Sequence, residues 1–215
     1  MPTEMTYTSL VTDLTQYAQR GNATNDAVVQ DQIPKIINLA ERQIARELKV
    51  QGFINVVQWT LTSGLAVYPK PDRWRETISM SIGTGTTNNT RVPLRELSYE
   101  AANNYWTDRT VTATPKFWAD YDYTHILIVG TPDAAYPSEW LYWQLLPLLD
   151  AVNTTNWLTQ YAPNALLHGS LKLLFEFLGN DDAVKWGAQY DRDMAGLAGE
   201  DTQKIVDRYY KRTTS

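Results

Sequence analysis

Apolar residues recur every three or four positions in four stretches of the chain, two near its start and two near its end. The first two stretches cover residues 7–18 and 27–48, and the last two cover residues 163–178 and 182–209. This spacing places the apolar side chains along one side of a helix. We therefore predict four helices, which pack as a four-helix bundle built from both ends of the chain. The residues expected to share its core are Ile36, Ile37, Ile44, Leu166, Leu171 and Leu174.

Single residues indicate where several of these helices begin and end. Thr6 or Thr8 can cap the first helix, because a threonine hydroxyl can accept a hydrogen bond from a free backbone N–H. Pro163 suits the first position of the third helix, where a missing N–H costs nothing. Gly52 is expected to stop the second helix. Glu41 lies in that helix, where we expect a polar outer surface.

The middle of the chain has the pattern of short strands. Its apolar positions are rich in β-branched and aromatic residues and are separated by turn residues. Ser98 is expected to cap one short helix that ends near Trp106. The predicted strands cover residues 53–62, 65–68, 74–82, 91–97, 125–129 and 139–146. Short strands at regular spacing predict an antiparallel sandwich or barrel-like domain.

Together these patterns predict an α+β fold in which a β domain interrupts a helical bundle. The predicted parts are N-terminal helices in residues 1–52, the inserted β domain in 53–150, C-terminal helices in 151–203, and a C-terminal tail in 204–215. The chain has 215 residues, 43% of them hydrophobic and 20% charged, so it can bury a real core.

Composition and charge exclude some classes of protein. The chain has no cysteine, so it can form neither a disulfide nor a thiolate metal site. Its net charge of −5 argues against a conventional nucleic-acid-binding surface. The N-terminus does not resemble a signal peptide, and no apolar run is long enough to cross a bilayer. We therefore expect a soluble protein with no membrane contact.

Residues that could carry catalysis are scarce, and no catalytic motif is present. His125 and His168 are far apart in the sequence, and each is expected to be a core histidine. Gly83, Thr84 and Gly85 resemble a phosphate loop, but no lysine or helix start follows them, so a hairpin tip is favoured. Asp120-Tyr121-Asp122 offers two carboxylates at alternate positions, too few oxygen ligands for calcium. We expect no enzyme activity, no cofactor and no metal.

One long block and several shorter segments resemble a known family. The block covers residues 155–169 and reads Thr-Asn-Trp-Leu-Thr-Gln-Tyr-Ala-Pro-Asn-Ala-Leu-Leu-His-Gly. Similar segments stand at residues 114–118 and 130–133 and in the aromatic strand through Tyr142 and Trp143. The chain resembles the head-to-tail adaptor (connector ring) proteins of tailed bacteriophages, most closely the tail tubular protein A type adaptors of short-tailed phages.

This resemblance implies a structural role in the virion. The chain would form a homo-oligomeric ring, twelve-fold in this family, below the portal protein at the head–tail interface. The ring would extend the DNA channel used in DNA ejection and would offer a docking platform to nozzle or tail proteins. DNA would pass without specific binding, in keeping with the acidic net charge. Assembly is expected in the host cytoplasm.

Two segments are candidate contact sites. Family resemblance suggests that the C-terminus contacts the portal, and Arg and Tyr are common in interface hot spots. The residues expected to bind the portal are Arg208, Tyr209, Tyr210, Lys211 and Arg212. The residues expected to line the channel or touch the next ring are Gly83, Thr84, Gly85, Asn88 and Asn89. The simpler interpretations are a frayed helix end and an ordinary hairpin tip.

A different function stays open at this point. A tryptophan- and tyrosine-rich chain, with 8 Trp and 13 Tyr, could be a phage tail or baseplate module that binds glycan or another tail protein. That alternative predicts aromatic side chains exposed as binding platforms.

Overall fold

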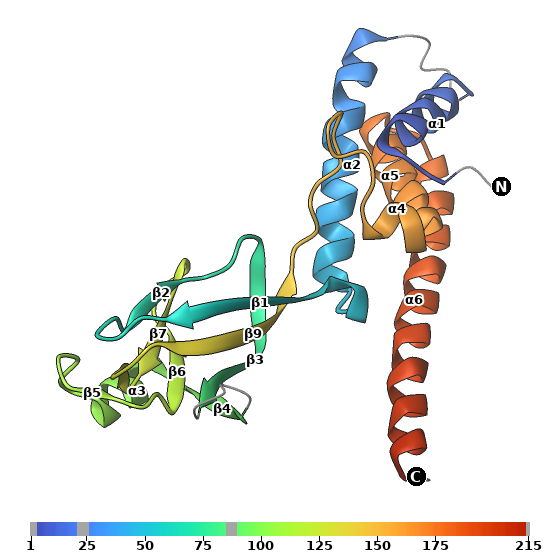
Figure 1. Cartoon of the computed structure of the whole chain (residues 1–215). Helices are drawn as coiled ribbons and strands as arrows, with labels where there is room; N and C mark the ends of the chain where they lie inside the picture. The colour runs from blue at the N-terminus through green and yellow to red at the C-terminus, as the bar shows by residue number, and fades with distance from the viewer. Residues whose placement is uncertain (1–3, 21–25, 85–89, 214–215) are drawn as a thin grey trace. The chain divides into compact units, whose positions relative to one another are not determined.

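The chain folds into two compact units, one made of Met1–Phe53 and Leu146–Ser215 and the other of Ile54–Leu145. This computed structural model describes residues 4–20, 26–84 and 90–213, and for residues 20, 201 and 203–213 it describes the backbone only. The first unit is helical and the second is mainly β (Figure 1). In sequence, the β unit is therefore an insertion between the two halves of the helical unit. The predicted α+β class is confirmed.

The helical unit is organised around one central helix. Helix α5 packs against α1, α2, α4 and α6, and α1 also packs against α2. The elements of this unit are α1 (Tyr7–Arg20), α2 (Ala27–Glu47), the 3-10 turn η1 (Gln51–Phe53), α4 (Trp157–Tyr161), α5 (Pro163–Phe177) and α6 (Asp182–Thr213). A regular four-helix bundle would instead give each helix two neighbours around a shared core. These contacts do not confirm that arrangement.

Helix α5 is central because its sequence lets other helices approach it from several sides. Leu166, Leu171 and Leu174 have no exposed surface, and all six predicted core residues are buried. Gly169 allows α2 and α6 to lie close to α5. A Cβ at position 169 would lie 3.1 Å from the ring of Tyr190 in α6 and 3.8 Å from Ala40 Cβ in α2. A larger residue at position 169 would push these helices apart.

The ends of the helices differ from the predictions at several places. Thr6 accepts a hydrogen bond from the backbone N–H of Ser9, as expected of a cap. Helix α2 begins after Asp26, whose side chain accepts from Val28 N, and it ends at Glu47 rather than at Gly52. The short helix α4 was not predicted. Residues 204–213, expected to be a tail, continue α6 as a helix.

Seven strands of the β unit form a single mixed sheet. The strands are β1 (Ile54–Leu61), β2 (Val67–Pro69), β3 (Trp74–Thr84), β4 (Thr90–Leu97), β6 (Phe117–Asp120), β7 (His125–Val129) and β9 (Tyr136–Gln144), and their order in the sheet is β1-β9-β3-β4-β6-β7-β2. All neighbours are antiparallel except β4 and β6, which are parallel. A second, two-stranded sheet pairs β5 (Thr112–Ala113) with β8 (Thr131–Pro132). Helix α3 (Tyr99–Tyr105) is capped by Ser98, as predicted.

The seven-stranded sheet curls into a half-barrel around its own core. One cluster of buried side chains draws residues from every strand of the sheet: Leu61, Tyr68, Met80, Ile82, Leu94, Trp118, Ile126, Ile128, Trp140 and Tyr142. The strands at the two ends of the order, β1 and β2, are joined by a short turn. The Tyr68 hydroxyl lies at this turn, accepting from Thr62 N at 2.8 Å and donating to Thr62 O at 3.1 Å. Of the two expected forms, the barrel-like one describes the unit better than a sandwich. The expectation that all strands pair antiparallel is wrong, because β4 and β6 are parallel.

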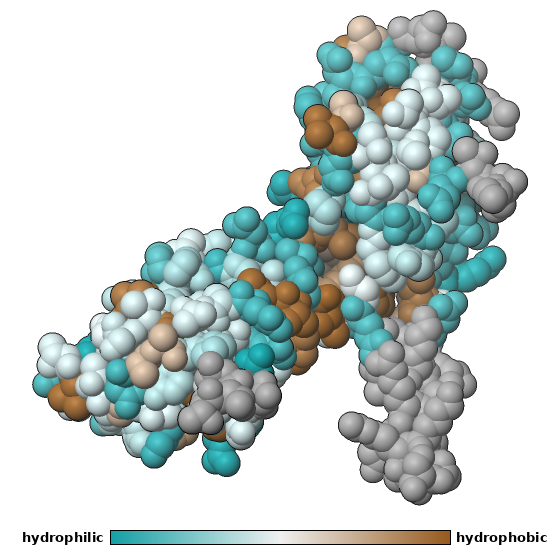
Figure 2. Space-filling view, viewed as in Figure 1, coloured by the Kyte–Doolittle hydropathy of each residue, from teal (hydrophilic) through white to brown (hydrophobic). Residues whose placement is uncertain are grey.

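Apolar residues on the surface are scattered on the face in view. They appear as separate brown patches among hydrophilic residues on both units (Figure 2). Among the helices that the structure describes, none is long and apolar enough to span a membrane.

Candidate docking groove of the helical unit

The short helix α4 is held in place by its own cap. Asn156 Oδ1 accepts hydrogen bonds from Leu158 N and Thr159 N, and Thr159 Oγ1 accepts from Asn156 N at 2.9 Å. This reciprocal capping box satisfies free backbone donors at the start of the helix. Asn156 and Thr159 are both buried, so the start of α4 has a fixed position.

A buried carboxylate fixes the segment that leads into α4. Glu41 in α2 is 1% exposed. Its Oε1 accepts from Asn156 Nδ2 at 2.6 Å, and its Oε2 accepts from Leu149 N at 3.0 Å. Burial raises the pKa of Glu41 above its ordinary value, although the bonds from Leu149 and Asn156 act in the opposite direction. The expectation that Glu41 lies on the outer surface is wrong, because this carboxylate anchors residues 149–156 to α2.

The aromatic side chains of α4 lie over the turn that follows α2. The indole of Trp157 covers Gly52 so closely that a Cβ at position 52 would overlap the ring. Trp157 also makes an edge contact with Phe53, with ring centroids 5.1 Å apart, and lies 5.6 Å from the ring of Tyr161. Gly52 therefore serves this packing, not the termination of α2.

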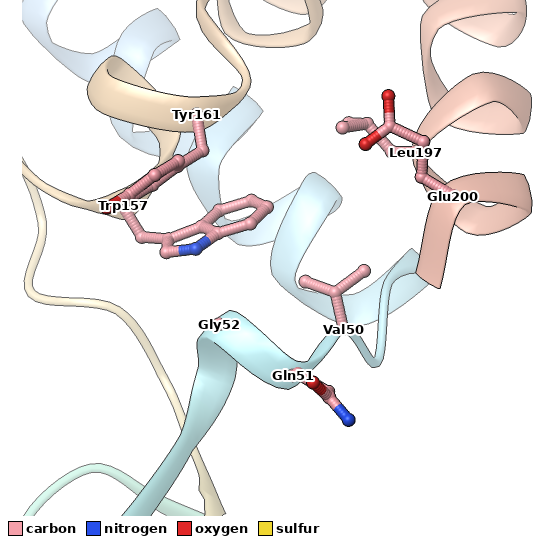
Figure 3. A pocket seen from close by; sticks show the side chains of 7 residues that line it. All are labelled: Val50, Gln51, Gly52, Trp157, Tyr161, Leu197 and Glu200. Atoms are coloured by element: carbon pink, nitrogen blue, oxygen red, sulfur yellow. The ribbon is translucent and has the colours of Figure 1, made fainter. Parts of the chain in front are cut away.

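A groove opens between α4, this turn and α6 (Figure 3). Its cavity volume is about 240 Å³, and its lining residues are Val50, Gln51, Gly52, Trp157, Tyr161, Leu197 and Glu200. Trp157 and Tyr161 stand on one side, and Leu197 and Glu200 of α6 face them across the groove (Figure 3). Tyr161 is 67% exposed, so its ring is accessible to a partner.

The groove continues along α6 toward the start of α5. A second cavity of about 230 Å³ shares Tyr161, Leu197 and Glu200 with the first and adds Arg192 and Asp193. Asp193 is bonded to His168 of α5, with 2.7 Å between Oδ2 and Nδ1. The imidazole of His168 in turn stacks on Trp186, with ring centroids 5.6 Å apart. His168 thus joins α5 to α6 from a half-buried position and is not a core histidine.

The chemistry of the groove suits a protein segment. Its lining combines aromatic and aliphatic side chains with the polar Gln51 and the charged Glu200. Interfaces commonly combine an apolar centre with a polar border. Among the described residues, no group of three or more His, Cys, Asp or Glu side chains could hold a metal ion.

The predicted contact residues fall partly outside the described structure. Residues 208–212 lie in the last turns of α6, and only their backbone is described. Gly83 and Thr84 belong to β3, where they pair with Arg91 and Thr90 of β4. Gly83 is buried, so the prediction that it lies at a hairpin tip is wrong. Strand β3 continues to Thr84, beyond the end at residue 82 that the sequence pattern indicated. Gly85, Asn88 and Asn89 lie outside the described residues.

The two carboxylates of Asp120-Tyr121-Asp122, which the sequence offered as a possible metal site, have structural roles. Asp120 pairs with Lys70 at 2.9 Å. Asp122 accepts hydrogen bonds from the backbone of Thr124 and His125 and contacts the ring of His125 at 3.0 Å, so it shapes the turn between β6 and β7. His125 is the first residue of β7 and has a partly exposed side chain, so it is not a core histidine.

A cluster of tyrosines on the β unit was not predicted. The Tyr99 hydroxyl accepts from Arg109 at 3.3 Å, and the Arg109 guanidinium lies 5.5 Å from the centre of the Tyr121 ring. Tyr105 and Tyr123 are 52% and 85% exposed. The abundance of tyrosine was visible in the sequence, but the contacts of Tyr99 and Tyr121 with Arg109 depend on the fold.

Comparison with protein families gives one match. The family model described as SU10 adaptor protein matches residues 5–213, nearly the whole chain. The comparison with curated proteins gives no match. The matched range includes both units and the groove.

Proposed function

The chain belongs to the SU10 adaptor protein family of phage head-to-tail adaptors, and from this premise we propose that it forms a ring below the portal protein. The ring is twelve-fold, extends the DNA channel and serves as the platform on which nozzle or tail proteins dock. Its subunits are made in the host cytoplasm and become part of the virion. The role is structural and not catalytic. The relationship to tail tubular protein A type adaptors is part of this proposal.

The length of α6 is the observation that supports portal docking. The helix has 32 residues and α5 has 15, which corresponds to about 48 Å and about 22 Å at 1.5 Å per residue. The C-terminal part of α6 continues beyond α4 and α5 (Figure 1). A helix of this length has a segment that α5 cannot cover. Such a segment gains stability by packing against a partner.

The residues in that segment suit an interface. Arg208, Lys211 and Arg212 supply positive charge, and Tyr209 and Tyr210 supply large rings with hydroxyl groups. Arginine and tyrosine are enriched among residues that dominate binding energies. We propose that these five residues contact the portal protein.

Truncation after Asp207 tests portal docking. The shortened chain should keep its circular dichroism spectrum and its thermal midpoint, because the helical core lies N-terminal to the cut. It should lose binding to purified portal protein in a light-scattering or pull-down assay. A chain that lacks only residues 214–215 is the matched control and should bind normally. Docking of the truncated chain with unaltered affinity would remove these residues from the interface.

The ring itself predicts a specific mass and a weak response to DNA. Light scattering of the chain with portal protein should give the mass of a cyclic assembly, and electron microscopy should give its symmetry. A channel wall that bound phosphates tightly would retain DNA, and the net charge of −5 disfavours such binding. We propose that Thr84, the last residue of β3, and residues 85, 88 and 89, which follow it in the sequence, line the channel or touch the next ring.

Exposed tyrosines of the β unit favour one alternative, a tail or baseplate module that binds glycan or another tail protein. Exposed aromatic rings such as Tyr105 and Tyr123 can stack on sugar rings or fill pockets of a protein. A glycan array separates this alternative from the adaptor role. Glycan binding that Tyr123→Ala abolishes, by a chain that does not bind portal protein, would favour the alternative.

A further inference from the structure

Strand β1 forms an open edge of the seven-stranded sheet. It pairs with β9 over its whole length, Ile54 to Leu61, and no other described strand adjoins it. Its register with β9 has no bulge. The outer side of β1 therefore presents a straight row of backbone groups.

The pairing shows which of these groups point outward. Thr60 stands opposite Pro137, and proline has no N–H to give to β1. The Val56 N–H bonds the side chain of the adjacent Asn55 at 2.8 Å and not β9. In an antiparallel pair, alternate residues direct both backbone groups to the same side. Val56, Gln58 and Thr60 thus direct their N–H and C=O groups away from β9.

This edge lacks the features that protect edge strands in soluble proteins. Native edges are commonly shortened, charged, bulged or broken by proline. Strand β1 has eight residues and contains no charge, no proline and no glycine. By contrast β2 has three residues and ends in Pro69. The first half of β4 is also an edge, and it is protected by Arg91 and Pro93. The backbone groups of these residues point to the same side of β4 as those of Arg95, whose N–H donates to Lys116 O next to β6.

The side chains of β1 are also incompletely covered. Val57 and Trp59 pack against the core of the half-barrel but remain partly exposed. Val56, on the other face of the strand, is 49% exposed. An additional strand beside β1 would cover the exposed parts of Val57 and Trp59. It would also form hydrogen bonds with the outward N–H and C=O groups of β1.

Among the strands of the seven-stranded sheet that the structure describes, a second copy of the chain does not offer a different edge that matches β1. Strands β2 and β4 are protected by the features described above, so the suitable partner within another copy would be its own β1. Pairing of β1 with β1 makes a two-fold contact, which closes as a dimer and does not propagate around a ring. The observations therefore favour a strand from a different protein.

We propose that β1 accepts an extended strand of another virion protein on the tail side, added to the sheet by backbone hydrogen bonds. This inference rests on the proposed adaptor function for the location of its partner. The incoming segment is uncharged, with β-branched or aromatic residues at alternate positions beside Val57 and Trp59. It carries small polar residues beside Gln58 and Thr60. Recognition of this kind takes its affinity from the backbone and its specificity from alternate side chains.

A pair of substitutions at one position tests the backbone contact. Gln58→Pro removes an outward N–H, and proline is tolerated where that N–H faces solvent. Gln58→Thr keeps the N–H but also loses the side-chain bond from Gln58 to Glu139, which measures 3.1 Å. In phage that encode these variants, both proteins should enter particles. Electron microscopy should show tails missing with Gln58→Pro and present with Gln58→Thr. Complete tails on Gln58→Pro particles would overturn the proposal.

Amide exchange followed by mass spectrometry gives an independent measurement on the unmodified chain. In the isolated protein, the amides of Gln58 and Thr60 should exchange quickly at every protein concentration. This should hold both for the single subunit and for the ring that it forms. In tailed particles their exchange should slow about tenfold or more. Slow exchange already in the isolated chain would assign the edge to a second copy and overturn the proposal. If tailed particles contain the chain but the amides of Gln58 and Thr60 still exchange quickly, this inference alone is overturned. If tailed particles do not contain the chain, the proposed function is overturned as well.

Discussion

The hydroxyl of Tyr190 donates a 2.7 Å hydrogen bond to Glu47 Oε2 and so joins α6 to the last turn of α2. The ring of Tyr190 is buried, and it lies against Gly169 of α5, so one side chain links three helices. Burial raises the pKa of Tyr190 above its ordinary value of 10, and the bond to Glu47 raises it further. The phenol therefore remains a donor at neutral and moderately alkaline pH.

Tyr190→Phe should lower the free energy of unfolding by about 1 kcal/mol, the usual net value of one hydrogen bond. The ring and its packing are retained, so only the bond to Glu47 is lost. Urea unfolding followed by circular dichroism measures the change. Tyr123→Phe is the matched control, because Tyr123 is 85% exposed, and it should have no effect. Equal stability of the two variants would show that the bond contributes nothing.

Gly52→Ala should displace Trp157 and disturb the groove. A Cβ at position 52 would overlap the indole, so α4 must move or the turn must open. We expect a loss of about 1–3 kcal/mol from this overpacking, together with a shift in tryptophan fluorescence. Gly199→Ala is the control: no atom of the described residues lies within 4 Å of a Cβ there, and alanine should stabilise α6 by about 0.5–1 kcal/mol. A stable Gly52→Ala protein with unchanged fluorescence would contradict the packing described for Trp157.

Glu41→Ala should destabilise the helical unit by roughly 2–5 kcal/mol. The change removes the acceptor of Leu149 N and one of the two acceptors of Asn156 Nδ2, which keeps its bond to Pro147 O. Each buried N–H that loses its acceptor costs about 1–3 kcal/mol. Thermal unfolding followed at a helix-sensitive wavelength measures the loss. Asp31→Ala, at an exposed position of the same helix, should change stability by less than about 0.5 kcal/mol. Similar midpoints for both variants would mean that the Glu41 contacts do not hold residues 149–156.

Asp122 should give the β unit a specific dependence on pH. Desolvation raises the pKa of Asp122, but hydrogen bonds from Thr124 and His125 outweigh it and bring the pKa from 3.8 to about 2. A carboxyl group whose pKa is lowered by folding stabilises the protein above its unfolded pKa, and this contribution is lost as the pH falls to the folded pKa. The difference in melting temperature between the natural chain and Asp122→Ala should be constant above about pH 4 and disappear toward pH 2. A difference that stays unchanged down to pH 2 would contradict the lowered pKa.

The sequence alone determined those features that depend on near neighbours in the chain. The stripe of Leu166, Leu171 and Leu174 predicted a buried helix, because a period of 3.6 residues places them on one side whatever lies opposite. The cap at Ser98 was predicted for the same reason, and the first cap was narrowed to Thr6 or Thr8, since a cap bonds N–H groups within three residues. The block at residues 155–169 was enough to indicate the family.

The tertiary structure decided the features that depend on distant residues. Strand β6 has only four residues, too few for a periodic pattern, and its parallel pairing with β4 joins segments about twenty residues apart in the sequence. Gly52 looked like a helix stop, but its role follows from the ring of Trp157. Glu41 is a charged residue of the kind expected on a helix surface. Its carboxylate nevertheless accepts hydrogen bonds from Leu149 and Asn156, which are 108 and 115 positions away in the sequence. A local pattern cannot predict such burial, because the burial of a charge depends on partners that only folding brings to it.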